Sequence, residues 1–451
     1  MAKYFGTNGV RGLLDLITPD FVSRMCAAFG HWSKCGKIVV ARDTRTSGEM
    51  LEYAAIAGLL SAGCQVVRLG IAPSPTAEYQ VLHQKANGAV VITASHNPPE
   101  WNAMKFVDAR GIAVSRETGE GIERLFESRS RKAAPWNALR PIVKYPLACE
   151  DHANAVRKSV DPSVFKNAKP SLVLDCANGT MAKVGPALFK SLGCRVTTIN
   201  ANMDGTFPGR PGEPTEANIG DLIASVKALG ADMGIAWDGD GDRVVFVDEK
   251  GKFVIGDRIF SLCADIALRE KKGDVVTTVA TTNAIRDIAA KYGSKVFYTG
   301  IGAPYLSEGV LTHDAVIGGE EVGGVVWPSL HFGKDGLMTA AKIVEAACAK
   351  PLSKLIAGLP VYYNSKTKIP CAPERKQRAM HAVAGFAKLA ASKGKITTID
   401  GIRVDFKDSW VIVRASGTEN YLRIFAEAKT QEKAELLMKE YEAIAVKAAG
   451  Q

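Results

Sequence analysis

The stretch KIVVARDTRTSGEMLEYAAIAGLLSAGCQVVRL, residues 37–69, carries the pattern that decides the fold. Lys37–Ala41 is an apolar run that predicts a strand, and Glu49–Ser61 has the spacing of a helix. Gly63 follows where a left-handed cap would end that helix, and a short β-branched strand comes after it. A helix between two short apolar strands is typical of a β-α-β unit in a largely parallel sheet.

The same order of strand, polar turn, helix, glycine and second strand occurs twice more. One copy is SLVLDCANGTMAKVGPALFKSLGCRVTTI at 171–199, in which Gly193 ends the expected helix. The other is DVVTTVATTNAIRDIAAKYGSKVFYT at 274–299, in which Gly293 does so. Three copies spaced on the order of a hundred residues apart are too few and too distant for a solenoid. They predict three α/β domains of common plan.

The chain after about residue 366 has a different pattern. It predicts a helix at Arg375–Ser392 and a closing helix at Gln431–Lys447, with four short strands between them. This combination indicates a small α+β domain with an antiparallel sheet. Pro360 and the polar stretch Asn364–Lys368 are interpreted as the linker before it. The expected strands are Thr397–Ile399, Gly401–Phe406, Ser409–Arg414 and Tyr421–Ala428.

The composition is that of a folded globular protein. Of 451 residues, 47% are hydrophobic and 23% charged, which excludes a disordered tail protein, a collagen-like repeat and a coiled-coil rod. The formal net charge of +10 could attract nucleic acid, an anionic surface or an acidic substrate. The basic residues are scattered, and the densest run, Arg129–Lys132, is interpreted as solvated surface. With no motif that interleaves aromatic and basic residues and no recognition helix, we expect no nucleic-acid partner.

Cysteine usage and the N-terminal stretch bear on the compartment. Nine cysteines form no C-x-x-C pair, so we expect buried free thiols in a reducing cytosol. The stretch MAKYFGTNGVRG lacks the apolar core of a signal peptide, and no apolar run is long enough to span a bilayer. These features predict a cytoplasmic protein with no membrane partner.

The sharpest local signal is WDGDGDR at 237–243. Separated by glycines, Asp238, Asp240 and Asp242 can curl so that their oxygens converge on one hard cation. Mg²⁺ is favoured over Ca²⁺ because few protein oxygens are offered, which leaves positions for a phosphate and water. An EF-hand is not expected, since Arg243 stands where that loop needs glycine. An exposed acidic turn without an ion is the alternative interpretation.

A second motif, GAVVITASHNPP at 88–99, places Ser95 in a polar loop at the end of an expected buried strand. A serine at a strand end is well placed to act as a nucleophile or phosphate acceptor. The chain has no G-x-S-x-G elbow and no P-loop, so neither a hydrolase triad nor a P-loop kinase is expected. Simple turn chemistry is the alternative.

A third motif is RASGTEN at 414–420, with a further arginine one strand step beyond. Two arginines, two hydroxyls and a glycine turn can clamp a phosphate through bidentate cations and free backbone N–H groups. A hairpin turn without a ligand is the alternative. Four more stretches are ambiguous by themselves: FGTNGVRG at 5–12, RDTR at 42–45, NAMK at 102–105 and GGEEVGG at 318–324.

Taken together and in this order, the motifs resemble those of the α-D-phosphohexomutase superfamily. TASHNP at 93–98 is similar to its phosphoserine loop and DGDGDR at 238–243 to its metal loop. Gly319-Glu320 is similar to its sugar-recognition loop and RASGT at 414–418 to its phosphate loop. Four collinear matches that cover essentially the whole chain are very specific.

The resemblance implies an α/β fold of four domains around a central cleft. Three similar α/β domains, at 1–150, 151–253 and 254–365, would carry the phosphoserine, metal and sugar loops. A C-terminal α+β domain at 366–451 would carry the phosphate loop. One Mg²⁺ per chain, a sugar bisphosphate as activator and intermediate, and a monomer or homodimer are also expected. The implied metal ligands are Ser95, Asp238, Asp240 and Asp242.

The resemblance also implies a role for each site residue. Ser95 would carry a phosphoryl group, give it to the free hydroxyl of a bound hexose monophosphate and recover the other phosphate after the bisphosphate turns over. Arg11 and Lys105 would handle the phosphoryl oxygens and the proton of the reacting hydroxyl. Arg243 would steady the phosphoserine, and Glu320 would hold sugar hydroxyls. The residues expected to grip the phosphate that is not reacting are Arg414, Ser416, Gly417, Thr418 and Arg423.

The sugar loop departs from the family pattern. Many members read Gly-Glu-x-Ser-Gly-His where this chain has GEEVGG at 319–324, so Val322 and Gly324 replace the hydroxyl and the imidazole. This change weakens any transfer of sugar preference. His331 is a candidate replacement for the missing imidazole.

The sequence therefore predicts a Mg²⁺-dependent isomerase that interconverts hexose or hexosamine 6-phosphate and 1-phosphate. KYFGT at 3–7 and TPDF at 18–21 make phosphoglucosamine mutase the first choice. The altered sugar loop supports the alternative, a phosphomannomutase/phosphoglucomutase of broader specificity. A sugar phosphatase that uses the same metal loop is the second enzyme hypothesis. A basic nucleic-acid-binding protein, motivated by the net charge alone, is the third.

Overall fold

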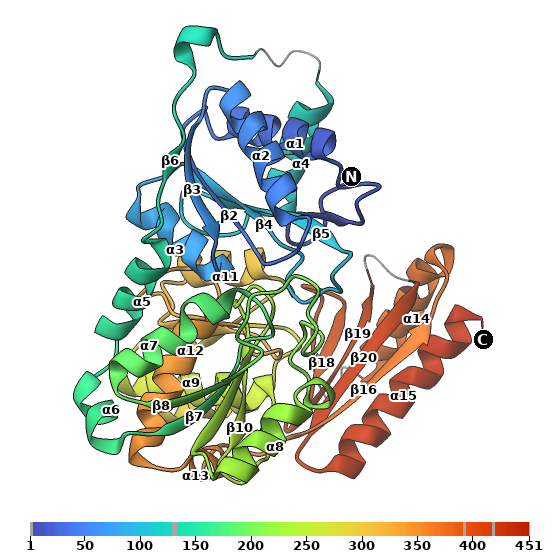
Figure 1. Cartoon of the computed structure of the whole chain (residues 1–451). Helices are drawn as coiled ribbons and strands as arrows, with labels where there is room; N and C mark the ends of the chain where they lie inside the picture. Colours follow the sequence, from blue (N-terminus) through green and yellow to red (C-terminus); the bar gives the residue numbers. More distant parts are fainter. Residues whose placement is uncertain (1–2, 129–132, 391–393, 417–419, 451) are drawn as a thin grey trace.

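A six-stranded mixed sheet forms the first unit of the fold (Figure 1). The computed structural model describes residues 3–128, 133–390, 394–416 and 420–450. The strands are β1 (Val10–Gly12), β2 (Lys37–Arg42), β3 (Gln65–Ile71), β4 (Gly88–Ile92), β5 (Asn102–Asp108) and β6 (Val143–Lys144). Their order is β1-β5-β4-β2-β3-β6. The strands of the predicted β-α-β unit, β2 and β3, are parallel, whereas β5 pairs antiparallel with both β4 and β1.

Helices cover both faces of this sheet. They are α1 (Pro19–Trp32), α2 (Gly48–Ser61), α3 (Ser74–His83) and α4 (Arg116–Glu127), and the next helix, α5 (Ala148–Lys158), packs against α3, α7 and α12. The buried side chains of α1, α2 and α4 form one apolar cluster with the strands. Those of α3 and α5 belong to a larger cluster that continues into the second and third units. α3 and α5 therefore join the first unit to the rest of the molecule.

The second unit has a five-stranded sheet of order β11-β10-β9-β7-β8. Its parallel part contains β7, β8 and β9, and β10 runs antiparallel to β9. The strands are β7 (Ser171–Asp175), β8 (Arg195–Ile199), β9 (Met233–Trp237), β10 (Val244–Asp248) and β11 (Phe253–Val254). The helices are α6 (Pro162–Ala168), α7 (Gly185–Leu192) and α8 (Gly220–Leu229).

The third unit has a four-stranded sheet of order β13-β12-β14-β15. β12 is parallel to both β13 and β14, and β15 is antiparallel to β14. The strands are β12 (Val275–Thr278), β13 (Val296–Thr299), β14 (Ile317–Gly319) and β15 (Val325–Val326). The helices are α9 (Gly256–Glu270), α10 (Ala284–Lys291), α11 (Ala303–Thr312), α12 (Gly336–Ala349) and α13 (Leu352–Ala357).

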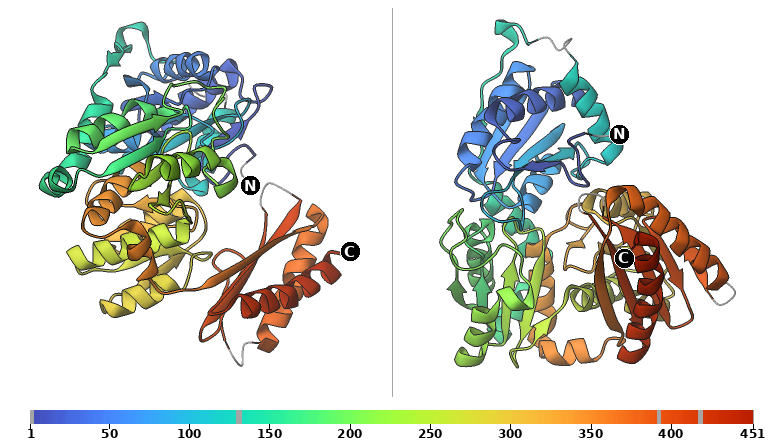
Figure 2. Two further views of the ribbon diagram at one scale, coloured as in Figure 1. Left: turned by 60° about the horizontal axis from the view of Figure 1, so that its bottom comes forward. Right: turned by 90° about the vertical axis from the view of Figure 1, so that its right-hand side faces the viewer.

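The fourth unit is an antiparallel five-stranded sheet of order β16-β20-β19-β18-β17 that stands to one side of the other three (Figure 2). Its strands are β16 (Tyr363–Pro370), β17 (Lys395–Thr397), β18 (Ile402–Asp405), β19 (Ser409–Ala415) and β20 (Tyr421–Ala428), and its helices are α14 (Pro373–Ala390) and α15 (Gln431–Ala449). The two helices form an apolar core with the strands. Trp410 and Ile412 of β19 pack instead against Val279 of the third unit. The predicted fold class, three α/β domains and an antiparallel α+β domain, is confirmed.

The glycines that end the three repeated helices have the predicted conformation. Gly63, Gly193 and Gly293 have φ values of +85°, +103° and +67°, in the left-handed region that side chains rarely adopt. Each one lets the chain leave its helix and enter the next parallel strand within two or three residues.

The expected linker at Asn364–Lys368 is wrong. These residues belong to β16, which pairs with β20 from Tyr363 to Pro370. β16 is an edge strand, and edge strands commonly carry charged side chains because these discourage pairing with another chain. Ile369 is buried, which shows the apolar side of the strand. The basic run Arg129–Lys132 lies outside the described residues.

Most of the cysteines are buried and all are free, as expected. All nine are free, and seven of them are buried. Within the described ranges, no helix combines the length and the apolar character needed to cross a membrane.

The contact between α1 and α2 generates a stability prediction. A Cβ at Gly58 of α2 would lie 2.0 Å from the carbonyl oxygen of Ser23 in α1, so Gly58→Ala must force the helices apart. We expect this change to lower the free energy of unfolding by about 2–3 kcal/mol. Gly385→Ala in α14 is the matched control, because no atom lies within 4 Å of the added methyl group. It should raise helix stability by about 0.5–1 kcal/mol. Urea unfolding followed by circular dichroism would measure both, and equal effects would contradict the packing described.

Candidate active site

The turn that joins β9 to β10, residues 238–243, holds the three aspartates. Gly241 has a φ of +77°, which lets the chain curl within six residues. Asp238 and Asp240 are fully buried, and Asp242 is 6% exposed. This burial excludes the alternative of an exposed acidic turn.

The aspartates fit a divalent cation. One carboxylate oxygen from each lies within 4.8 Å of those of the other two. In addition, Oδ1 of Asp240 and Oδ1 of Asp242 are buried without a hydrogen-bond partner. An unpartnered buried carboxylate oxygen is costly, and a hard cation with oxygen ligands would remove that cost.

Three cations, one from each of the first three units, surround the aspartates. Lys105 of β5 places Nζ 2.6 Å from Oδ2 of Asp240 and 3.4 Å from Oδ2 of Asp242. Lys334, which precedes α12, places Nζ 3.4 Å from the same oxygen of Asp242. Arg243 donates from Nε to the remaining aspartate at 3.1 Å. The buried negative charge is therefore compensated from three directions.

The crowding shifts the pKa values of these groups. Burial opposes the charge of Lys105, but the carboxylates of Asp240 and Asp242 outweigh it and raise the pKa of that lysine above its ordinary value. Burial, together with the Asp242 carboxylate, raises the pKa of Asp238 to about 8. Lys105 is thus a cation at neutral pH, and the aspartate cluster holds a proton there in the absence of a metal ion.

Ser95 lies in the loop after β4 with its hydroxyl directed at the metal loop. Its Oγ donates to Oδ2 of Asp238 at 3.0 Å. Its φ of +54° is left-handed, which is uncommon for a residue with a side chain. Buried Arg45 holds the loop in this form, donating to the carbonyl oxygens of Ser95, Asn97 and Pro98. Backbone strain of this kind concentrates at functional sites.

Arg243 and His96 flank the serine hydroxyl. Nη2 of Arg243 lies 3.4 Å from Oγ of Ser95 and also donates to Nδ1 of His96. Burial and the nearby guanidinium lower the pKa of His96 to about 4, so the imidazole is neutral. Glu213 accepts from Nη1 of Arg243 at 2.7 Å and fixes the guanidinium. The flanking pair therefore presents a single positive charge to the serine.

A cleft of about 330 Å³ brings residues from all four units together. Ser95 lines it, and so does Arg11 of β1, whose Nη1 donates to Oδ1 of Asn97 at 2.7 Å. The cations of the lining outnumber its carboxylates, which suits a ligand with several negative charges. The cationic lining residues are Arg11, Lys105, Arg243, Lys334, Arg414 and Arg423, and the acidic ones are Asp242 and Glu320.

The expected phosphate loop is placed in part. Arg414, Ser416 and Arg423 line the cleft, whereas Gly417 and Thr418 lie outside the described residues. Arg414 pairs in bidentate form with Asp400, at 3.0 Å and 2.7 Å. A phosphate at this arginine would therefore meet a guanidinium that already has a carboxylate partner.

The sugar loop contains a cation that the sequence interpretation missed. Glu320 of this loop accepts from Nζ of Lys334 at 2.8 Å. Lys334 also fills the space beside Gly324, where an added Cβ would lie 2.4 Å from its Cδ. His331 is absent from the cleft lining and is buried behind it, so it does not stand in for the missing imidazole. The ammonium of Lys334 occupies that region instead.

Several residues around the site escaped the sequence interpretation as site residues, among them Arg45, Lys334, Glu213 and Asp400. Arg45 lay within the ambiguous RDTR stretch, and its cluster of charges was the available signal. Lys334, Glu213 and Asp400 lie in loops without a distinctive motif, so no local pattern separated them from surface charge.

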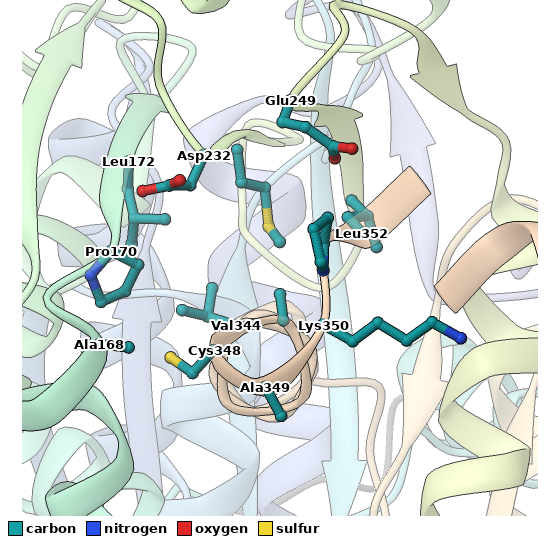
Figure 3. A pocket seen from close by; sticks show the side chains of 13 residues that line it. Ala168, Pro170, Leu172, Asp232, Glu249, Val344, Cys348, Ala349, Lys350 and Leu352 are labelled. Carbon is teal, nitrogen blue, oxygen red and sulfur yellow. The ribbon is translucent and has the colours of Figure 1, made fainter. Parts of the chain in front are cut away.

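A second hollow, of about 260 Å³, lies at the amino ends of β7 and β9, away from the metal loop (Figure 3). None of the predicted site residues lines it. Its carboxylates already have partners, since Asp232 accepts from Ser171 and Glu249 accepts from Ser353. The carboxylates of this hollow are therefore less available to a ligand than the polar groups of the cleft.

Most of the chain matches one enzyme family. The family models for phosphoglucomutase/phosphomannomutase alpha/beta/alpha domains I, II and III match residues 2–133, 150–251 and 255–363. The model for the C-terminal domain of the same family matches residues 367–444. The chain belongs to this family, within the α-D-phosphohexomutase superfamily. It is accordingly an isomerase of the phosphohexomutase class.

Individual relatives agree with the family but differ in name. A phosphoglucomutase/phosphomannomutase of Thermococcus kodakarensis is 46% identical and covers 96% of each chain. A Methanopyrus kandleri protein named "Probable phosphoglucosamine mutase" is 37% identical and covers 98% of this chain and 97% of its own. The crystal structure of a family protein from Burkholderia thailandensis superposes with a TM-score of 0.88 at 26% identity, covering 100% of this chain and 98% of its own.

The environment of Lys334 generates a second prediction. Lys334→Met should leave the carboxylates of Glu320 and Asp242 without this cation and shift the sugar loop. We expect kcat/KM for phosphohexose isomerisation to fall by about tenfold to a hundredfold. Lys342→Met is the matched control, because Lys342 is equally buried on α12 but pairs with Glu270, away from the cleft. Equal kcat/KM values for the two variants in a steady-state assay would contradict the assignment.

The raised pKa of Asp238 generates a third prediction. Below about pH 8 the carboxyl holds a proton that a divalent ion must displace, so Mg²⁺ affinity should rise as the pH increases from about 6 to 8. Calorimetry in buffers of different ionisation enthalpy would report both the affinity and the released proton. Asp238→Asn should bind Mg²⁺ weakly and without this pH dependence. A wild-type affinity that does not change with pH would contradict the prediction.

Proposed function

We propose that the protein interconverts the 6-phosphate and 1-phosphate of a hexose through a phosphoserine at Ser95 and a bisphosphorylated sugar. One observation carries the proposal: the hydroxyl of Ser95 faces the buried aspartate cluster within a cleft lined by cations of all four units. A nucleophile beside a metal site, with room for two phosphates, suits phosphoryl transfer in both directions.

The metal would be a single Mg²⁺ per chain. Asp238, Asp240 and Asp242 would hold it together with an oxygen of the phosphorylated Ser95. When bound, it supplies positive charge that offsets the charge on the transferring phosphoryl group. Mg²⁺ suits a site with few protein oxygens, because it retains water and phosphate ligands.

The cations of the cleft would act on the reacting groups. Arg243, 3.4 Å from Oγ of Ser95, would hold the phosphoserine oxygens. As the sugar oxygen bonds to phosphorus and the bond between phosphorus and Oγ of Ser95 breaks, cationic Lys105 would give a proton to Oγ and take up the proton that the sugar hydroxyl loses, so that no proton is gained or lost overall. Lys105 and Arg11 would also stabilise the phosphoryl oxygens during the transfer.

The remaining cleft residues would hold the sugar and the second phosphate. Glu320 would accept hydrogen bonds from sugar hydroxyls. The residues proposed to grip the phosphate that is not reacting are Arg414, Ser416, Gly417, Thr418 and Arg423. After one transfer the bisphosphate would turn over in the cleft, so that its other phosphate meets Ser95.

For the sugar, we propose a phosphomannomutase/phosphoglucomutase of broad specificity. Val322 in place of a hydroxyl in the sugar loop and the 46% identity to the Thermococcus kodakarensis relative support this choice. Phosphoglucosamine is the second candidate, supported by the KYFGT and TPDF stretches and by the name of the Methanopyrus kandleri relative. Comparing kcat/KM for the phosphates of glucose, mannose and glucosamine would decide between them.

The role of Ser95 generates a fourth prediction. Ser95→Ala should abolish the conversion of hexose 1-phosphate to 6-phosphate in the presence of Mg²⁺ and a sugar bisphosphate, as followed by phosphorus NMR. Ser61→Ala at the end of α2, remote from the cleft lining, is the matched control and should keep full activity. Full activity of Ser95→Ala would exclude the mechanism. If the wild-type protein releases inorganic phosphate instead of forming the isomer, the phosphatase alternative is favoured.

A further inference from the structure

A buried polar cluster lies behind the cleft, where α3, α5 and the segment before α12 meet. It contains His152 of α5, with His331 and Asp335 from that segment, and each is at most 1% exposed. Nε2 of His152 lies 2.8 Å and Nε2 of His331 3.0 Å from the same oxygen, Oδ2 of Asp335. The other ring nitrogen of His152 lies 2.9 Å from Oγ1 of Thr76 in α3. The mechanism described above uses none of these side chains.

The hydrogen bonds of His331 define its protonation. The backbone N–H of Gly333 donates to Nδ1 of His331 at 3.0 Å, so Nδ1 carries a lone pair and no proton. The neutral ring is then protonated on Nε2, which donates to Asp335. A nitrogen that carries this proton cannot also bind a metal ion. The cluster is therefore a hydrogen-bonded latch in which one carboxylate accepts from two imidazoles.

Asp335 connects this latch to the cleft through its neighbours. Its Oδ1 accepts from the backbone N–H groups of Leu337 and Met338 and so caps α12. Lys334, the residue before it, contacts the sugar and metal loops. The carbonyl of Gly336, the residue after it, accepts from the indole of Trp237 next to the metal loop at 3.0 Å.

α3 contacts the same two regions from the first unit. The N–H of Ser74, at the first position of α3, donates to the carbonyl of Asp240 at 2.9 Å, and its hydroxyl donates to the carboxylate. Thr76, on the same turn, contacts His152 through a hydrogen bond, and Tyr79, on the next turn, contacts it through a stacked ring. The same helix therefore touches the metal loop with its first residue and the latch from its first two turns.

We infer that the His152–Asp335–His331 cluster is a positioning site for phosphoryl transfer, which fixes Lys334 and the metal loop relative to the unit that carries Ser95. The inference rests on the proposed function for its kinetic consequence. Its geometric consequence, the placement of the metal loop, is independent of that function.

The Asp335→Asn variant removes the carboxylate oxygen that accepts from both imidazoles but keeps an oxygen that can cap α12. The amide oxygen of asparagine can still cap α12, but its NH₂ group would face two N–H donors. His331 cannot change tautomer without losing the hydrogen bond from Gly333. We expect kcat to fall by about tenfold or more, with KM changed far less, and the affinity for Mg²⁺ to fall several-fold. Asp161→Asn, the same change at the exposed N-cap of α6, should leave kcat, KM and the affinity for Mg²⁺ unchanged.

The experiment measures kcat, KM and Mg²⁺ affinity per folded molecule, with the folded fraction taken from circular dichroism. An Asp335→Asn variant with wild-type kcat and Mg²⁺ affinity per folded molecule would overturn the inference. If the wild type isomerises no hexose phosphate, the proposed function fails, and the Mg²⁺ affinity of Asp335→Asn then decides the positioning role alone.

Two further measurements guard against a variant that fails to fold. Nitrogen-15 NMR of the wild type should show His331 neutral at pH 7 and protonated on Nε2, and a proton on Nδ1 would overturn the inference. His152→Gln can place an amide N–H near the position of Nε2, whereas His152→Ala cannot. The glutamine variant should therefore retain more of the wild-type kcat than the alanine variant, and equal losses would count against the latch.

Discussion

Three buried carboxylates at the β9–β10 turn are the constraint on which the rest of the structure depends. Burying like charges is unfavourable unless opposite charges or a metal ion offset them. Lys105, Arg243 and Lys334 supply that compensation from three different units. The charge on a single tight turn therefore dictates how the first three units must meet, and the cleft forms where they do.

The strands explain why the functional loops converge. The serine loop follows β4, the metal loop follows β9 and the sugar loop follows β14, so all three begin where strands end. In open α/β sheets, ligand sites form at the carboxyl ends of the strands for this reason. The antiparallel fourth unit completes the cleft from the side, with Arg414 at the end of β19 and Arg423 on β20.

Much of this could be predicted from the sequence, because the repeated β-α-β pattern and the glycine caps are local signals. The aspartate turn and the Ser95 loop could also be predicted, because each is a short local motif. The polar edge strand at Asn364–Lys368 was mistaken for a linker, since an edge strand lacks the apolar alternation that marks a central one. Lys334 could not be predicted, because its importance comes from Glu320 and Asp242, which only the tertiary fold brings beside it.

The division of the charged centre among the units has a consequence for synthesis. The chain emerges from its amino end, so Lys105 is made before the aspartates, whereas Lys334 follows Asp242 by 92 residues. Until that lysine has left the ribosome, the nascent second unit holds an acidic turn that lacks one of its three cations. Water or free ions must meanwhile solvate that turn. The centre can therefore close only late in translation, once the chain beyond α12 allows the third unit to dock.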